Sequence, residues 1–358
     1  MLKKLFNCIL LLIIGLCCKA QTLVPINNKA LRFVGRVFMT DSTAELSWPS
    51  SEIKLNFNGT AISATIKDEL GDNYYNIIVD DKLFKVLHLE NVKKDYLLAD
   101  GLKSNKHTLE IFKRTESRMG KTSFFQFLLP KDAFILAIPK PQKRKIEVFG
   151  NSISCGYAVE DTTGKDRGTS PYENAYLSYT GIMARHFNAE LHNTSKSGIG
   201  ITVSWFPLIM SEMYDREQEG DSIKKWNFSK FTPNLVIINL FQNDSWIVKL
   251  KDNPEFKARF GTEPPSDTYI INAYSDFIKS IRNKYPLAPI VCILGSMDAS
   301  KEGSPWSGYI EKAVEGLHDK NIYSHIIPYK NTPGHPSVKE QQAMADDLRA
   351  YIEKNIKW

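Results

Sequence analysis

The chain has 358 residues, of which 42% are hydrophobic and 24% are charged. These proportions are ordinary for a globular protein and exclude a disordered chain, a fibrous repeat and a polytopic membrane protein. At roughly 150 residues per domain, the length predicts about two domains. The formal charge is +6 and falls to +3 once the three lysines of a predicted leader are removed. Since no dense basic cluster occurs beyond residues 140–145, a nucleic-acid partner is not expected.

The N-terminus has the pattern of a secretory signal peptide. Two lysines are followed by an apolar stretch that is too short for a comfortable transmembrane helix, and Cys18-Lys19-Ala20 forms a small-x-Ala cleavage site. We therefore expect residues 1–20 to be removed, with Gln21 as the mature start and a secreted or periplasmic product. A lipid at Cys17 or Cys18 ranks second, because the residues before each cysteine fit a lipidation signal poorly.

Cysteine usage argues against a disulfide framework. Three of the five cysteines lie in the predicted leader, which leaves Cys155 and Cys292 in the mature chain. No zinc-binding spacing is present, so no structural metal is expected. Beyond the leader, no integral membrane span is predicted, and the sequence carries no indication of an oligomeric state.

The first half of the mature chain has the period-two pattern of short antiparallel strands. Between about residues 30 and 138, apolar residues alternate with polar ones and turn-forming pairs recur, as is typical of a β-sandwich. No helix of convincing length is expected there. We therefore predict an N-terminal antiparallel β-sandwich, jelly-roll-like, over residues 21–139. Its clearest predicted strands are residues 53–57, 61–66, 74–79, 83–89, 107–113 and 124–128.

A basic, proline-rich connector, Pro139–Lys145, leads into a second half with a different rhythm. There, short apolar strands alternate with amphipathic helices. This pattern predicts an α/β/α domain with a parallel sheet over residues 140–358, and sites in such sheets form at the carboxyl ends of the strands. The predicted strands are 146–149, 189–192, 234–240, 289–294 and 323–329, and the predicted helices are 172–187, 267–284, 309–318 and 337–354.

Four signals follow the sheet elements of this second half in chain order. Ser152 comes just after a buried strand beside Gly150, which places its hydroxyl on a tight turn. Gly198 lets the backbone approach a ligand closely, and Asn243 brings an amide donor. His335 lies in a loop between proline and glycine residues, and histidine is the usual base for a serine nucleophile. Each signal alone is as well explained by a cap, a turn or a loop, but their joint order is hard to obtain by chance.

These blocks resemble the SGNH hydrolase superfamily, which is named after its Ser, Gly, Asn and His motifs. The matching residues, in block order, are Gly150-Asn-Ser152, Gly198, Asn243 and His335. The two-domain layout is more specifically similar to carbohydrate esterase family 2. The further residues that carry this likeness are Gly35-Arg36, Trp48, Lys113-Arg-Thr-Glu116 and the Cys-Gly-Tyr157 tail of the serine block. The resemblance covers almost the whole mature chain.

Three positions depart from the superfamily pattern. Asn151 stands where Asp usually precedes the serine, and Phe241-Gln242 stands where Gly-Thr usually precedes the asparagine. The superfamily often carries an Asp shortly before the histidine, but here those positions are Thr332-Pro333. The resemblance therefore implies a Ser–His dyad in which a backbone carbonyl orients His335. A distant acid, Asp298, is the less favoured substitute.

The resemblance implies a secreted esterase that removes O-acetyl groups from plant polysaccharides such as xylan. In the implied mechanism, Ser152 attacks the acetyl carbonyl and His335 accepts its proton. The oxyanion is held by the backbone N–H groups of Ser152 and Gly198 and by the side chain of Asn243. The expected partner is an acetylated polysaccharide or oligosaccharide, and no cofactor or metal is expected.

Several aromatic residues are candidates for substrate contact. Trp246 follows the asparagine block closely, and Tyr157 ends the serine block. A core position is equally plausible for Trp246. For the sandwich aromatics a core role is the better reading; these are Trp48, Tyr74, Tyr75, Phe124 and Phe125.

Two other function classes stay open at this point. The altered serine and asparagine blocks fit a secreted glycan-binding protein that has lost catalysis. A second alternative is an SGNH esterase or lipase that acts on lipids or other small esters, although the sequence shows no long apolar lid segment.

Overall fold

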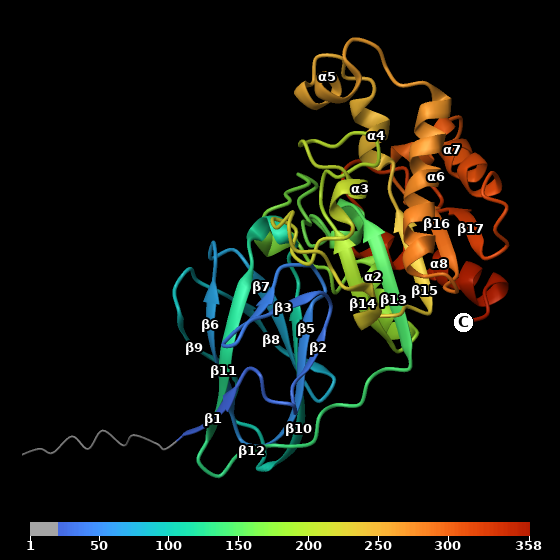
Figure 1. The fold of residues 1–358 in the computed structure, drawn as a ribbon. Coiled ribbons are helices and arrows are strands. Elements are labelled where there is room, and N and C mark those ends of the chain that lie inside the picture. The colour runs from blue at the N-terminus through green and yellow to red at the C-terminus, as the bar shows by residue number, and fades with distance from the viewer. Residues whose placement is uncertain (1–20) are drawn as a thin grey trace, which may run out of the picture.

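The computed structural model describes residues 21–358, which form a β-sandwich joined to an α/β domain (Figure 1). The predicted signal peptide and its alternative lipid anchor lie outside the described residues. No helix in the part of the chain that is described is long and apolar enough to cross a membrane. Cys155 and Cys292 are both buried and free.

The sandwich consists of two six-stranded antiparallel sheets. The first has the path β3-β4-β11-β6-β9, with β1 paired to β11, and the second has the path β12-β5-β10-β7-β8, with β2 paired to β5. The strands of the first sheet are β1 (Gln21–Pro25), β3 (Val37–Met39), β4 (Ala44–Leu46), β6 (Ile62–Asp68), β9 (Lys94–Ala99) and β11 (Thr122–Pro130). Those of the second are β2 (Arg32–Val34), β5 (Glu52–Gly59), β7 (Tyr74–Val79), β8 (Lys82–His88), β10 (Asn105–Lys113) and β12 (Phe134–Ile135).

The predicted β-sandwich is confirmed, and its alternating pattern explains how the sheets face each other. Ile53, Leu55 and Phe57 are fully buried along one face of β5, as period-two side chains must be when one face meets a core. Among the sandwich aromatics, Tyr75 and Phe124 are also buried and contact edge to face, so they are core residues. The sequence missed the short strands β2, β3, β4 and β12, which are too brief to show a period, and it also missed β1 and β9.

The second domain is a five-stranded parallel sheet of order β14-β13-β15-β16-β17, covered by helices on both faces as predicted (Figure 1). Its strands are β13 (Arg144–Gly150), β14 (Ala189–Ser195), β15 (Leu235–Asn239), β16 (Ile290–Leu294) and β17 (Ile322–Ile326). Its helices are α1 (Ser152–Cys155), α2 (Tyr179–His186), α3 (Met210–Met213), α4 (Gln242–Ile247), α5 (Pro254–Phe260), α6 (Asp267–Lys284), α7 (Pro305–Glu315) and α8 (Val338–Asn355). Phe149 packs toward α6 and α7, whereas its neighbour Val148 packs toward α2 and α8.

Two predicted helices have different starts in the structure. The helix expected from residue 172 begins only at Tyr179, because the Ser178 side chain caps it and the preceding residues form an irregular buried segment. The helix expected from residue 309 begins at Pro305, where proline occupies the first helical turn without losing a hydrogen bond.

Buried polar contacts fix the sandwich to the α/β domain. Arg36 of the sandwich forms an ion pair with Glu147 of β13 at 2.8 Å, and the two side chains are 1% and 0% exposed. The indole N–H of Trp48 donates to the backbone carbonyl of Glu217 at 2.8 Å. A buried ion pair fixes the relative orientation of the domains, since a shift that parted the two side chains within the interface would leave each charge buried without its partner. The two domains therefore act as one unit.

Candidate active site

Ser152 lies at the carboxyl end of β13, on the first turn of α1. The side chain of Asn151 caps this helix by accepting the backbone N–H of Ile153 at 3.0 Å. The departure from the usual Asp at this position is thus tolerated, because the amide oxygen caps as a carboxylate would. Gly150 is required by packing: a Cβ there would lie 2.1 Å from the hydroxyl oxygen of Ser154. The turn leaves Ser152 5% exposed, at the edge of solvent.

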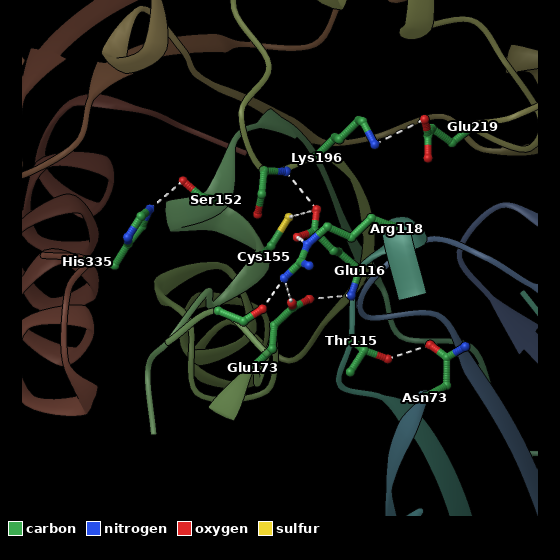
Figure 2. Close-up of polar contacts among 12 residues, drawn as sticks. Asn73, Thr115, Glu116, Arg118, Ser152, Cys155, Glu173, Lys196, Glu219 and His335 are labelled. Atoms are coloured by element: carbon green, nitrogen blue, oxygen red, sulfur yellow. Dashed lines mark hydrogen bonds and ion pairs between the residues drawn. The ribbon is translucent and has the colours of Figure 1, made fainter. Parts of the chain in front are cut away.

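His335 lies directly beside this serine, although the two residues are 183 positions apart in the chain. The Nε2 atom of His335 is 2.8 Å from the Oγ of Ser152 (Figure 2). The loop before α8 presents the ring, and Tyr157 packs against one face of it with ring centroids 4.3 Å apart. This geometry allows the imidazole to take the hydroxyl proton.

An acid missed by the sequence analysis orients the histidine. The Nδ1 of His335 donates to the carboxylate of Asp166 at 2.9 Å, and the backbone N–H of His335 donates to the same carboxylate at 2.9 Å. Burial opposes ionisation of Asp166, but its hydrogen bonds with His335 and the charges of His335 and Lys330 hold the pKa of this carboxyl below its ordinary value. The expectation that a backbone carbonyl orients His335 is therefore wrong, and the site has a Ser–His–Asp arrangement.

Asp298 is not the orienting acid either. Its carboxylate accepts the indole N–H of Trp246 at 2.8 Å and the side-chain amide of Gln242 at 2.8 Å. These bonds tie the start of α4 to the loop after β16. Trp246 is thus held by its indole nitrogen, and part of its ring packs against the core between the sheet and helices α2 and α8. That part of the ring surface is not available to contact a substrate.

The groups predicted to bind an oxyanion lie at the ends of three neighbouring strands. Within residues 21–358, the backbone N–H groups of Ser152 and Gly198 donate to no protein acceptor, so both are free to bind a negative oxygen. Gly198 has φ +85°, a conformation that side chains other than glycine rarely adopt. Asn243 uses one amide proton on the carbonyl of Ile199 at 2.8 Å, and its second amide proton has no such bond.

An exposed tryptophan, Trp205, adjoins these donors. Its side chain is 45% exposed, and its indole N–H donates to the side-chain oxygen of Asn243 at 3.2 Å. The backbone N–H of Trp205 donates to the carbonyl of Gly198 at 3.1 Å, so the ring is fixed beside the oxyanion groups. A rigid aromatic face of this kind is a surface on which a sugar ring can stack.

No group of three or more His, Cys, Asp or Glu side chains in the described residues is arranged to hold a metal ion. The nucleophile, the base and the orienting acid are all protein side chains.

Comparison with known proteins gives the family. The carbohydrate esterase 2 N-terminal domain matches residues 33–139. A solved family two carbohydrate esterase from Clostridium thermocellum, in complex with cellohexaose, is 32% identical with a TM-score of 0.80, and the match covers 90% of this chain and 98% of that one. The chain belongs to carbohydrate esterase family 2. The match also confirms the predicted SGNH-type α/β/α domain, which follows the sandwich in the chain.

Two characterised relatives support the same family assignment. The cellulase/esterase CelE of Acetivibrio thermocellus is 32% identical over 347 residues, which is 93% of this chain but only 40% of that relative's length. The acetylxylan esterase / glucomannan deacetylase of Cellvibrio japonicus is 23% identical over 94% of this chain and 91% of that relative.

Two residues of this family 2 site escaped the sequence analysis. Asp166 lies in the irregular loop between α1 and α2, and no spacing to His335 distinguishes it from other loop acids. Trp205 had a weak signal, since it follows the glycine block by only a few residues. Of the predicted site residues, Ser152, Gly198, Asn243 and His335 lie together, whereas Asp298 is bonded elsewhere.

Proposed function

We propose that this protein is a serine esterase that removes O-acetyl groups from plant polysaccharides of the acetyl xylan or glucomannan type. The observation that carries the proposal is the 2.8 Å contact between Ser152 Oγ and His335 Nε2, with Asp166 on the opposite ring nitrogen. This arrangement is suited to acyl transfer from an ester to water. The names of the family relatives support the same class of substrate.

In the proposed first step, the Oγ of Ser152 attacks the acetyl carbonyl while His335 accepts the hydroxyl proton. Asp166 holds the Nδ1 proton, so that Nε2 is the basic nitrogen, and stabilises the imidazolium that forms. The new oxyanion lies against the free N–H groups of Ser152 and Gly198 and the spare amide proton of Asn243.

The tetrahedral intermediate then collapses. His335 gives its proton to the departing sugar oxygen, which leaves as the alcohol, and the acetyl group stays on Ser152. In the second half of the reaction, His335 takes a proton from water as its oxygen attacks the acetyl-serine carbonyl, and a second tetrahedral intermediate forms. This intermediate expels the Ser152 oxygen, which takes the proton back from His335, and acetic acid leaves and loses its own proton to solvent. The cycle returns every group to its starting protonation state and uses no cofactor.

Trp205 supports a carbohydrate rather than a lipid as the leaving group. A tryptophan that is 45% exposed beside the oxyanion donors offers a flat apolar face for a pyranose ring. The solved relative in complex with cellohexaose is a precedent for β-linked glucan binding by a family member. We therefore place the acetylated sugar between Trp205 and the Ser152–His335 pair.

The proposal is tested by acetate release from a panel of acetylated xylan, acetylated glucomannan and acetylated cello-oligosaccharides. We expect the wild-type chain to release acetate from at least one of these, with Ser152→Ala inactive on all. A matched panel of 4-nitrophenyl esters of increasing chain length should show a preference for acetate. A preference for long acyl chains, with no release from any polysaccharide, would reassign the protein to the lipase alternative.

The glycan-binding alternative makes the opposite prediction in the same assay. A protein that binds cello-oligosaccharide but releases no acetate from esters of any kind would fit it. The complete Ser–His–Asp geometry speaks against this outcome, because a site kept only for binding has no need of an oriented base.

We further propose that the mature protein starts at Gln21 and is secreted or exported to the periplasm. The basis is the leader pattern of residues 1–20. When the full-length chain is expressed in a host with a secretory pathway, the intact mass of the product should match residues 21–358. A product that carries a lipid at Cys17 or Cys18 would favour the anchored alternative, and an unprocessed cytoplasmic product would contradict both.

A further inference from the structure

A short segment of the N-terminal sandwich reaches the site of the other domain. Residues 114–118 follow strand β10 and lie against the end of α1, as Figure 2 shows for Glu116 and Arg118. Glu116 is fully buried, yet it belongs to the sandwich and not to the domain that carries Ser152. A carboxylate buried at a domain boundary must be compensated by hydrogen bonds or an opposite charge, because burial of an unpaired charge is costly.

The carboxylate of Glu116 binds the loop that contains Gly198. Its Oε2 accepts the backbone N–H of Ser197 at 2.6 Å, and the thiol of Cys155 at 3.8 Å. Its Oε1 accepts the Nε–H of Arg118 at 2.8 Å. Ser197 directly precedes Gly198, so the charge of Glu116 fixes the peptide that leads into the oxyanion donor.

We call residues 196–204 the oxyanion loop. Glu116 fixes it on the N-terminal side of Gly198, and Asn243 fixes it on the other side by donating to the carbonyl of Ile199 at 2.8 Å. Asp244 holds the far end of the loop by accepting the N–H groups of residues 201–203 at 2.6 to 3.2 Å. Gly198 thus lies between contacts from its own domain and one contact, that of Glu116 with Ser197, that comes from the sandwich.

A second buried carboxyl group, Glu173, lies beside Glu116 and shares the guanidinium of Arg118 with it. Burial and the nearby charge of Glu116 raise the pKa of Glu173 well above its ordinary value, so Glu173 holds a proton more readily. Arg118 contacts both carboxylates, at 2.8 and 3.4 Å. Because Glu116 pairs with Arg118 through Oε1, its Oε2 is left to accept the Ser197 N–H, and a hydrogen bond to the carboxylate of an ion pair is stronger than one between neutral groups.

We propose that Glu116 is a positioning residue for ester hydrolysis: by binding the Ser197 N–H, it sets the Gly198 N–H at the place where the oxyanion forms. The sandwich is then part of the catalytic apparatus and not only a scaffold or a wall of the cleft. This inference rests on the proposed esterase function and adds to it a contribution from the other domain.

The substitution Glu116→Gln tests this proposal, because it keeps the size and shape of the side chain and replaces one carboxylate oxygen with an NH₂ group. Both oxygens of Glu116 face donors, so an amide must turn its NH₂ toward either Ser197 N–H or Arg118 and lose that bond. Because a small misplacement of an oxyanion donor is costly, we expect kcat on 4-nitrophenyl acetate to fall about 10- to 100-fold with KM nearly unchanged. Asn243→Ala, which removes a proposed donor itself, sets the scale at about 10²–10³-fold.

A transition-state analogue separates positioning from general damage. Phenylboronic acid forms a tetrahedral adduct with a catalytic serine, so its inhibition constant should rise in Glu116→Gln by the same factor by which kcat/KM falls. Amide hydrogen exchange in the oxyanion loop should also become faster. A loss of folded protein alone would lower the concentration of active sites and leave the inhibition constant of the remainder unchanged, which would overturn the proposal.

Two further variants complete the test. Glu190→Gln is the matched control, since Glu190 is buried and pairs with Arg32 of the sandwich but lies at the opposite end of β14 from the oxyanion loop, and it should leave kcat unchanged. If Glu116→Gln does not fold, Arg118→Met, at a side chain 37% exposed, removes one support of the same carboxylate and should raise the boronic acid constant in the same direction. Wild-type constants in Glu116→Gln, or in Arg118→Met where Glu116→Gln does not fold, would refute the role of Glu116, whereas an active Ser152→Ala would refute the esterase function itself.

Discussion

Replacing Ser152 with alanine is expected to lower kcat for an acetyl ester by about 10⁶-fold, the scale seen when a serine hydrolase loses its nucleophile. The physical reason is that His335 then has no hydroxyl to activate at 2.8 Å, and acyl transfer cannot pass through a covalent intermediate. Residual hydrolysis by water held near the oxyanion donors should remain about 10³–10⁴-fold above the uncatalysed rate. The measurement is steady-state hydrolysis of 4-nitrophenyl acetate, with mass spectrometry of the acetylated enzyme after rapid acid quenching.

The matched control for this experiment is Ser154→Ala in the same helix. Ser154 is fully buried and bonds the Tyr179 hydroxyl at 2.8 Å, so its loss affects packing and not the nucleophile. We expect this variant to keep kcat and to lose some thermal stability. An acetylated peptide that contains Ser154 and not Ser152, or full activity in Ser152→Ala, would show that the nucleophile is assigned wrongly.

The second large effect is expected at Asp166. Asp166→Asn should lower kcat by up to about 10⁴-fold, because an amide no longer forces the proton onto Nδ1 and His335 then spends most of its time in the tautomer that cannot accept the serine proton. The backbone bond from His335 N–H to the side-chain oxygen is retained, so the loop should stay in place. The change is measured as kcat on 4-nitrophenyl acetate, with circular dichroism to show that the fold is intact.

Asp298→Asn serves as the matched control for Asp166. Asp298 also lies near the carboxyl end of the sheet, but its partners are Trp246 and Gln242. We expect near-wild-type kcat from this variant. If the two results were exchanged, with Asp298→Asn inactive and Asp166→Asn active, the orienting acid in solution would be the distant one and the arrangement around His335 would need revision.

The sequence predicted the nucleophile and the base because each carries a local signal. Gly150 and Asn151 mark a strand-to-helix turn at Ser152, and the proline and glycine residues around His335 mark a constrained loop. Sequence order alone then suggested that these blocks share one sheet edge, since parallel strands end on the same side. The structure places the two side chains at hydrogen-bond distance.

Asp166 had no comparable signal. Its neighbours, Lys165 and Arg167, form a polar stretch like many surface loops. Asp166 has a left-handed backbone conformation with φ 55°, but aspartate can adopt this conformation, so the sequence shows no sign of it. The sequence pattern pointed only to the residues before His335 and to the end of the fourth strand of the sheet. Asp166 lies instead in the loop that follows α1, and it bonds Nδ1 of His335, the ring nitrogen that does not face Ser152.

The role of Glu116, in the other domain, likewise could not be predicted from local sequence. The tripeptide Arg114-Thr115-Glu116 was noted only as part of a family likeness, and a buried glutamate next to a strand end predicts no partner by itself. Its bond to Ser197 exists because the sandwich packs against the α/β domain through contacts such as Arg36–Glu147. Residues 81 positions apart are brought together by this packing.

The sequence by itself therefore determined what repeats along the chain: the sandwich from its period of two, the parallel sheet from alternating strands and helices, and the serine and histidine from motifs on tight turns. Tertiary structure alone decided which loop acid orients His335 and which sandwich carboxylate holds the oxyanion loop. The physical reason is that periodicity and turn chemistry depend on neighbours within a few residues. The approach of two loops, by contrast, depends on how whole layers pack, and no short segment of sequence contains that information.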